Sequence, residues 1–162
     1  MTTLAVTGHM DLTEDSVPLV RTALDKLLDL YADDTLVGIS CIAKGSDTLF
    51  AQAVLAVGGR LIVVMPSRDY RRSTVEQDDA PVFDQLVEAA GEVVVLPHEV
   101  ADRQAYDAAN RVLLERADRL VAVWNGEPPS GKGGGTADTV LAARAAGIPV
   151  DVVWPDGAER QG

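Results

Sequence analysis

Residues 120–140 read LVAVWNGEPPSGKGGGTADTV, and this stretch decides the fold class. It begins with an apolar run typical of a buried strand and continues through a loop rich in glycine and proline. It ends in an alanine-rich segment that begins at Thr136 and has the pattern of a helix. Parallel α/β sheets are built from strand–loop–helix units of this kind. The rest of the chain repeats the unit.

Further short apolar runs follow one another along the chain, at 4–7, 36–40, 61–65, 92–96 and 149–154. Between them, apolar residues recur at intervals of three and four, as in helices that cover a sheet. The runs are continuously apolar, which is typical of strands buried on both faces. The sequence therefore predicts an α/β fold: a single Rossmann-like domain over residues 1–155, with a doubly wound, mainly parallel sheet and helices on both faces. Residues 156–162 are expected to form a flexible tail.

Composition and charge narrow the classes of function. The chain has 14 basic and 25 acidic residues and a net charge of -11, which predicts that neither nucleic acid nor membrane is a partner, because both are anionic. Its single cysteine and the absence of paired CxxC motifs predict no disulfide, no metal site and no cofactor. No signal peptide is visible and no apolar run reaches the ~18 residues of a membrane span, so we expect a cytoplasmic protein.

The predicted architecture indicates where a ligand would bind. In open parallel sheets, ligands bind beyond the carboxyl ends of the strands. The polar and glycine residues that follow the predicted strands are therefore the candidate ligand-binding residues: Thr7, Gly8, Ser40, Lys44, Gly45, Asp47, Arg68, Trp124 and Asn125. Asn110 joins them because it lies on an apolar, inward helix face, where its amide must be hydrogen-bonded to backbone or ligand.

The glycine-rich loop is the strongest single signal. Gly133, Gly134 and Gly135 allow the backbone to approach a ligand closely, and Thr136 adds a hydroxyl at the start of a helix, where anions bind. The alternative is a plain turn with Thr136 as the helix cap. The loop is not a P-loop, because Gly133 replaces the Ser or Thr that binds magnesium there and Pro128-Pro129 removes two N–H groups.

Several candidates have a structural alternative. Lys44 either pairs with a phosphate or is a solvated surface residue, and Asp47 either caps a helix or binds a ribose hydroxyl. Arg68 lies in an arginine cluster that suits phosphate, or in a mobile surface loop. Trp124 either packs in the core or stacks on a base. His9 is a candidate phosphate donor or acid–base group.

Four segments together resemble a known superfamily. They are Thr7-Gly8-His9, SCIAKGSDTLFAQAVLAVGGRLIVVMP (40–66), AYDAANRVLLERADRLVAVWNG (105–126) and GGGTADTVLAARAAGIPV (133–150). The chain is similar to the Rossmann-like SLOG superfamily, which joins Lonely Guy proteins, DNA-processing protein A and lysine-decarboxylase-like proteins. The resemblance implies nucleotide binding, with the GGxGT-like segment on the phosphate. It also implies a homo-oligomer, a dimer or tetramer.

The chain departs from the Lonely Guy pattern at its catalytic position. In that family the signature continues GTxxE, and the glutamate position corresponds to Thr139 here. Asp138 lies one residue earlier, about 100° around the helix. Two functions therefore stay open. One is binding or sensing of a nucleotide-derived small ligand, and the other is a nucleotide N-glycosidase of the phosphoribohydrolase type that uses Asp138, Glu99 or His9.

Overall fold

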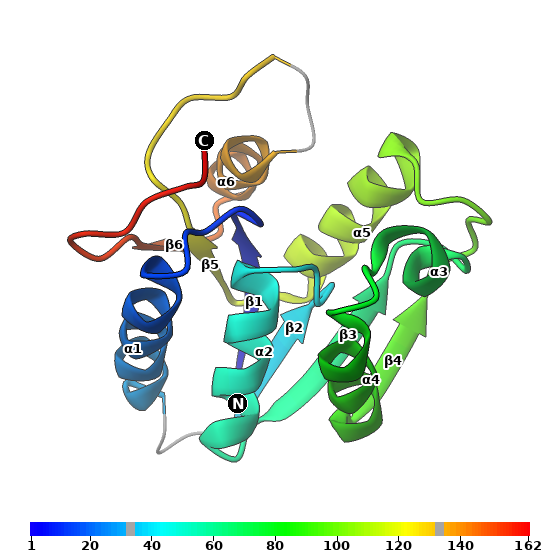
Figure 1. Ribbon diagram of the computed structural model, residues 1–162, viewed down its shortest axis with the longest axis horizontal. Helices are drawn as coiled ribbons and strands as arrows, with labels where there is room; N and C mark the ends of the chain where they lie inside the picture. Colours follow the sequence, from blue (N-terminus) through cyan, green and yellow to red (C-terminus); the bar gives the residue numbers. More distant parts are fainter. Residues whose placement is uncertain (32–34, 132–134) are drawn as a thin grey trace.

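A computed structural model describes residues 1–31, 35–131 and 135–162. In these ranges the strands are β1 (Thr2–Gly8), β2 (Leu36–Ser40), β3 (Arg60–Met65), β4 (Glu92–Val95), β5 (Arg119–Val123) and β6 (Val150–Val153). The helices are α1 (Ser16–Asp29), α2 (Ser46–Ala56), α3 (Tyr70–Thr74), α4 (Ala80–Ala89), α5 (Arg103–Arg116) and α6 (Thr136–Ala145). Strands and helices alternate through most of the chain (Figure 1). No helix in the described ranges is long and apolar enough to cross a membrane.

The strands form one parallel sheet in the order β4-β3-β2-β1-β5-β6. The chain builds the sheet outward from β1 to β4, then returns to the other side of β1 with β5 and β6. The direction of winding therefore reverses between β1 and β5. This arrangement confirms the predicted Rossmann-like, doubly wound α/β fold.

Each face of the sheet has its own helical layer. On one face, α1 contributes Val20 and Leu24 and α2 contributes Phe50, and these pack on Leu4 and Val6 of β1. The α4 helix lies on the same face, where Phe83 and Leu86 meet Leu61 and Val63. On the other face, α5 and α6 cover Ala5, Ile39 and Leu120 through Ala109, Leu113 and Ala143. Figure 1 shows α1, α2 and α4 ranged along one side of the sheet.

The loops after β1 and β2 are packed against each other with no space for larger residues. A Cβ atom on Gly8 would lie 2.4 Å from Cβ of Ser46 and 2.8 Å from Cβ of Val123. Gly45 has a φ of 83°, and a Cβ there would lie 2.8 Å from the carbonyl oxygen of Met10. The Ser46 hydroxyl donates a 2.7 Å hydrogen bond to the carbonyl of His9. The backbone of residues 8–10 is thus held between β5 and the start of α2.

The last residues of the chain lie along the loop after β1. Arg160 forms an isolated antiparallel bridge with Leu12, and its guanidinium donates a 2.8 Å hydrogen bond to the Asp11 carboxylate. The backbone N–H of Gln161 donates to the carbonyl of Asp11 at 2.7 Å. Residues 159–161, expected to belong to a flexible tail, therefore contribute to the same edge of the molecule as the loops after the strands.

The loop packing predicts different costs for two glycine substitutions. Gly45→Ala combines a positive φ with a clash against backbone carbonyls, so we expect a loss of about 3 kcal/mol in unfolding free energy. Gly58→Ala is the matched control, because Gly58 also has a positive φ of 78° but no atom within 4 Å of its built Cβ. It should lose only about 1 kcal/mol. Urea unfolding measures both, and equal losses would contradict the close approach of the two loops.

Candidate functional site

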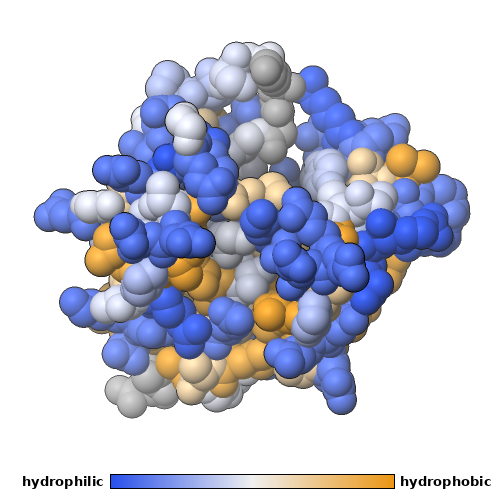
Figure 2. Space-filling model, in the orientation of Figure 1, coloured by the Kyte–Doolittle hydropathy of each residue, from blue (hydrophilic) through white to orange (hydrophobic). Residues whose placement is uncertain are grey.

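A cavity of about 920 Å³ opens at the carboxyl edge of the sheet. Its walls come from the loops after β1, β2 and β5, from the starts of α2 and α6, and from α3, α4 and α5. In Figure 2 the surface is hollowed between the segment after β5 and the side of α5. Cavities of this size hold nucleotide-sized molecules. The cavity spans the point between β1 and β5 where the winding reverses, which is where open α/β sheets bind ligands.

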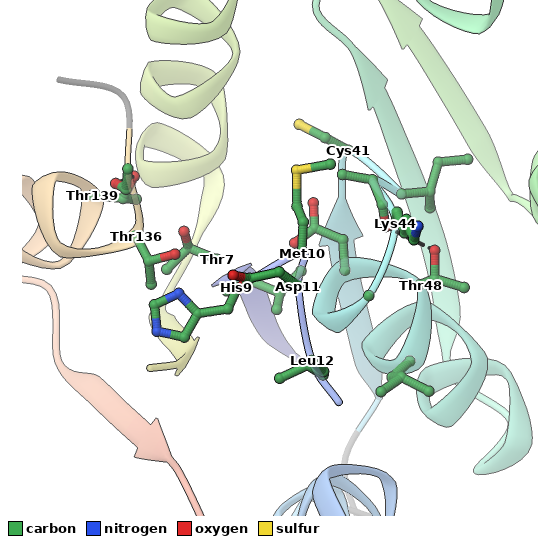
Figure 3. Close-up of a pocket in the computed structure, with 18 of the residues that line it drawn as sticks. Thr7, His9, Met10, Asp11, Leu12, Cys41, Lys44, Thr48, Thr136 and Thr139 are labelled. Carbon is green, nitrogen blue, oxygen red and sulfur yellow. Dashed lines mark hydrogen bonds between the residues drawn. The ribbon is translucent and has the colours of Figure 1, made fainter. Parts of the chain in front are cut away.

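His9 joins the ends of β1 and β5. Its Nε2 accepts a 3.2 Å hydrogen bond from the N–H of Asn125, and its ring meets Trp154 edge-on at 5.6 Å. Burial lowers the pKa of His9, and the charge of Arg160 lowers it further. His9 is therefore neutral near pH 7, and Nε2 is occupied as an acceptor. Figure 3 shows His9 and Thr136 on the same side of the cavity.

The start of α6 is capped by its own carboxylate. The N–H of Gly135 donates to Oδ2 of Asp138 at 3.0 Å. Thr139 is buried, and its hydroxyl donates to the carbonyl of Gly135 at 3.4 Å. Gly135, not Thr136, is the cap residue of the helix. A ligand anion at this end of α6 would meet the Asp138 carboxylate. Two of the predicted loop residues, Gly133 and Gly134, lie outside the described residues.

A second carboxylate, Asp47, stands on the α2 side of the cavity. Burial raises its pKa to about 7, against a lowering by the hydrogen bond from the N–H of Ala43. Burial raises the pKa values of the Cys41 thiol and the Tyr70 hydroxyl, and the charge of Asp47 raises both further, which keeps both groups protonated. Cys41 is therefore an unreactive wall residue, as its burial indicates.

The charged side chains that line the cavity are mostly acidic. The two cations found among the described lining residues are engaged: Lys44 Nζ lies 3.8 Å from Oε2 of Glu76, and Arg160 binds Asp11. The carboxylates on the wall are those of Asp11, Asp47, Glu76, Asp79, Glu127 and Asp138. In the described ranges, no group of three or more acidic, histidine or cysteine side chains has the geometry of a metal site.

Most of the candidates from the sequence meet at this cavity. The lining residues among them are Thr7, Gly8, His9, Lys44, Gly45, Asp47, Asn110, Trp124, Gly135, Thr136 and Asp138. Figure 3 shows Thr7 between the α6 side, marked by Thr136 and Thr139, and the α2 side, marked by Lys44 and Thr48. Their roles as ligand contacts stay predictions.

Three described candidates do not line the cavity. Ser40 is fully buried, and its hydroxyl is used twice within the fold, as donor to the carbonyl of Asp47 and as acceptor from the N–H of Ile42. Arg68 is exposed and forms an ion pair with Glu99 outside the cavity. Asn125 instead holds His9 through its backbone.

Several lining residues were missed by the sequence analysis. Arg160 reaches the cavity only because the end of the chain pairs with Leu12, and no local pattern indicates that contact. Tyr106 lines the cavity one helical turn before Asn110. That spacing on an inward face is the signal that would have included it.

The state of Asp47 predicts how stability depends on pH. Its pKa is raised on folding, so the folded protein binds more protons than the unfolded chain between about pH 4 and 7, and stability falls as pH rises through that window. Asp47→Asn keeps an acceptor for the Ala43 N–H and removes the charge. We expect the Tm of the variant to exceed that of the wild type by about 3 °C or more at pH 8, with little difference at pH 5. A scanning-calorimetry difference that does not change with pH would exclude a buried, titrating Asp47.

Comparison with known proteins gives matches in structure alone. No family model and no curated protein matches the chain. DNA processing protein A (DprA) from Streptococcus pneumoniae matches with 20% identity and a TM-score of 0.66 over 94% of this chain and 50% of that chain. DprA from Helicobacter pylori, described for its single-stranded DNA binding mode, matches with 17% identity and a TM-score of 0.66 over 93% and 64%. The Moco carrier protein from Chlamydomonas reinhardtii matches with 20% identity and a TM-score of 0.59 over 94% and 75%.

These matches correct one expectation. The net charge of -11 predicts that nucleic acid is not a partner, and that prediction is wrong, because the same fold occurs in a protein described as binding single-stranded DNA. Net charge averages over the whole protein surface, whereas a bound DNA strand contacts only one part of that surface. The cytoplasmic location and the homo-oligomer stay predictions. The chain spans about half the length of the Streptococcus protein, and it shares the Rossmann-like fold of these matched proteins.

Proposed function

We propose that the chain binds a nucleotide-derived small molecule in the cavity at the carboxyl edge of the sheet. The observation that carries the proposal is the position of this cavity, about 920 Å³ in volume, across the reversal of winding between β1 and β5. The fold places loops and helix starts from both halves of the sheet around one space there. The structural neighbours, among them a molybdenum cofactor carrier, support a ligand of this general class.

The proposed sugar–phosphate end of the ligand lies beside α6. Thr7 and Thr136 contribute hydroxyls to this part of the wall. Trp124 is held in place, because its indole N–H donates to the carbonyl of Glu127 at 3.0 Å and the Arg144 guanidinium lies 5.9 Å from its ring. A fixed aromatic side chain suits a binding wall. The contact between phosphate and the N–H groups of residues 133–136 stays a prediction: the N–H of Gly135 is bonded to Asp138, and residues 133 and 134 lie outside the described ranges.

Binding without hydrolysis is the form of the proposal that the side chains favour. Cleavage of an N-glycosidic bond benefits from a carboxylate that stabilises the developing positive charge or activates water. Thr139 has no carboxylate and directs its hydroxyl into its own helix. The Asp138 carboxylate caps α6, and the Nε2 atom of His9 is occupied.

The terminal nucleotide of a single-stranded DNA is the second candidate ligand. The shared fold with the Helicobacter DprA favours it. An oligonucleotide that occupies the cavity through its end would compete with a mononucleotide. An oligonucleotide that binds elsewhere on the surface would not compete. A competition experiment therefore distinguishes binding in the cavity from binding outside it.

Filling the cavity tests the binding proposal. Asn110 is half-buried on the cavity wall, and Asn110→Phe places a ring in the space the ligand would occupy. Glu115→Phe is the control, because Glu115 is exposed on the same helix and lies away from the cavity. A panel of nucleosides and nucleotides should raise the Tm of the wild type and of the control, and should not raise that of Asn110→Phe. Equal Tm shifts in all three proteins would place binding elsewhere, and no shift with any ligand would defeat the proposal.

The hydrolysis alternative has its own test. Incubation with nucleoside monophosphates should release no free base above the uncatalysed rate, as measured by chromatography. Robust release that is lost in Asp138→Asn but retained in Thr139→Val would show that Asp138 acts as the catalytic acid. The binding-only form of the proposal would then be wrong.

A further inference from the structure

The end of the cavity farther from α6 has an apolar wall, where residues of the hydrophobic core reach the cavity. Ile42, Val75 and Phe83 line it together with Tyr70 and Tyr106, whose ring centroids lie 6.3 Å apart. Tyr70 also packs on Phe83, with 6.1 Å between their ring centroids. These residues come from the loop after β2 and from α3, α4, α5 and the segment between α3 and α4. A space with flat, apolar walls suits a heterocyclic ring better than a sugar or a phosphate.

Several carboxylates line the cavity, and Asp47 is the one whose charge acts on the Tyr70 hydroxyl in this apolar wall. Asp47 lines the cavity from the first turn of α2, and its identified hydrogen bond comes from the N–H of Ala43. Among the described residues no cation forms an ion pair with it, since the nearby Lys44 is engaged with Glu76. A carboxylate has about four acceptor sites, so one backbone bond leaves most of its capacity unused.

Asp47 is half-buried, so apolar walls replace part of the water that would otherwise hydrogen-bond to its carboxylate. A ligand that supplies donors at this position restores those hydrogen bonds. The partner that fits a carboxylate best offers two parallel N–H groups in one plane. A planar ring that carries a ring N–H beside an exocyclic amino group has this edge.

We propose that the apolar end of the cavity binds the heterocycle of the ligand and that Asp47 accepts two hydrogen bonds from a guanine-type edge. The inference rests on the proposed function and names its ligand class. Adenine offers an amino group beside a ring nitrogen that is an acceptor, so that nitrogen would face a carboxylate oxygen without a proton between them. Such a mismatch rejects a ligand more strongly than the loss of apolar contact does.

Isothermal titration calorimetry with three nucleosides at pH 8 tests the inference. Guanosine presents both donors, inosine lacks the exocyclic amino group, and adenosine lacks the ring N–H. The wild type should bind guanosine at least about tenfold more tightly than adenosine, with inosine between them. Adenosine that binds as tightly as guanosine would overturn the inference.

Two variants make the assignment specific to Asp47. Asp47→Asn keeps an acceptor for the Ala43 N–H but presents an amide to the ring, so its affinity for guanosine should fall about tenfold or more while its affinity for adenosine does not fall. Asp78→Asn removes an exposed carboxylate that does not line the cavity and should leave the preference unchanged. Unchanged guanosine affinity in Asp47→Asn, with the variant folded by circular dichroism, would refute the role of Asp47.

The same titrations separate this inference from the proposed function. If adenine nucleotides bind, and Asn110→Phe abolishes that binding, the cavity is the site and only the guanine-type edge is wrong. If none of the nucleosides or nucleotides binds the wild type, both the proposed function and the inference fail.

Discussion

The close fit of Gly8 and Gly45 between neighbouring backbones is the constraint on which the cavity depends. Both glycines lie where a Cβ atom would meet another residue at less than 3 Å, one against Ser46 and Val123 and the other against the carbonyl of Met10. This fit fixes the loops after β1 and β2 relative to the end of β5. Strands on either side of the reversal send their helices to opposite faces, so a space stays open between the loop after β1 and the loop after β5.

Within that space, the arrangement of charge determines what the wall recognises. Burial keeps His9 neutral, Asp138 accepts from the N–H of Gly135 at the cap of α6, and the identified lining cations are already paired with carboxylates. The wall thus offers acceptors more than free positive charge. A planar ring that carries hydrogen-bond donors therefore complements this wall better than a highly charged phosphate chain does.

The fold could be predicted from the sequence because continuous apolar runs and helical periods are local signals. The loops after the strands pointed to the carboxyl edge, so Thr7, His9, Lys44 and Thr136 were expected near one another. Long-range contacts could not be predicted in this way: Arg160 reaches the cavity through pairing with Leu12, and the Ser40 hydroxyl turns inward to α2. The exclusion of nucleic acid failed because net charge contains no information on where charges lie.

Titration with guanosine, followed by ¹⁵N-resolved NMR of the backbone amides, tests directly whether the cavity binds the ligand. Binding there should give saturable shifts in residues 7–10, 43–48 and 106–110, with α1 and the edge strands β4 and β6 unchanged. Shifts concentrated instead around Arg103 and Arg111 on the outer side of α5, or no saturable shifts at all, would contradict it.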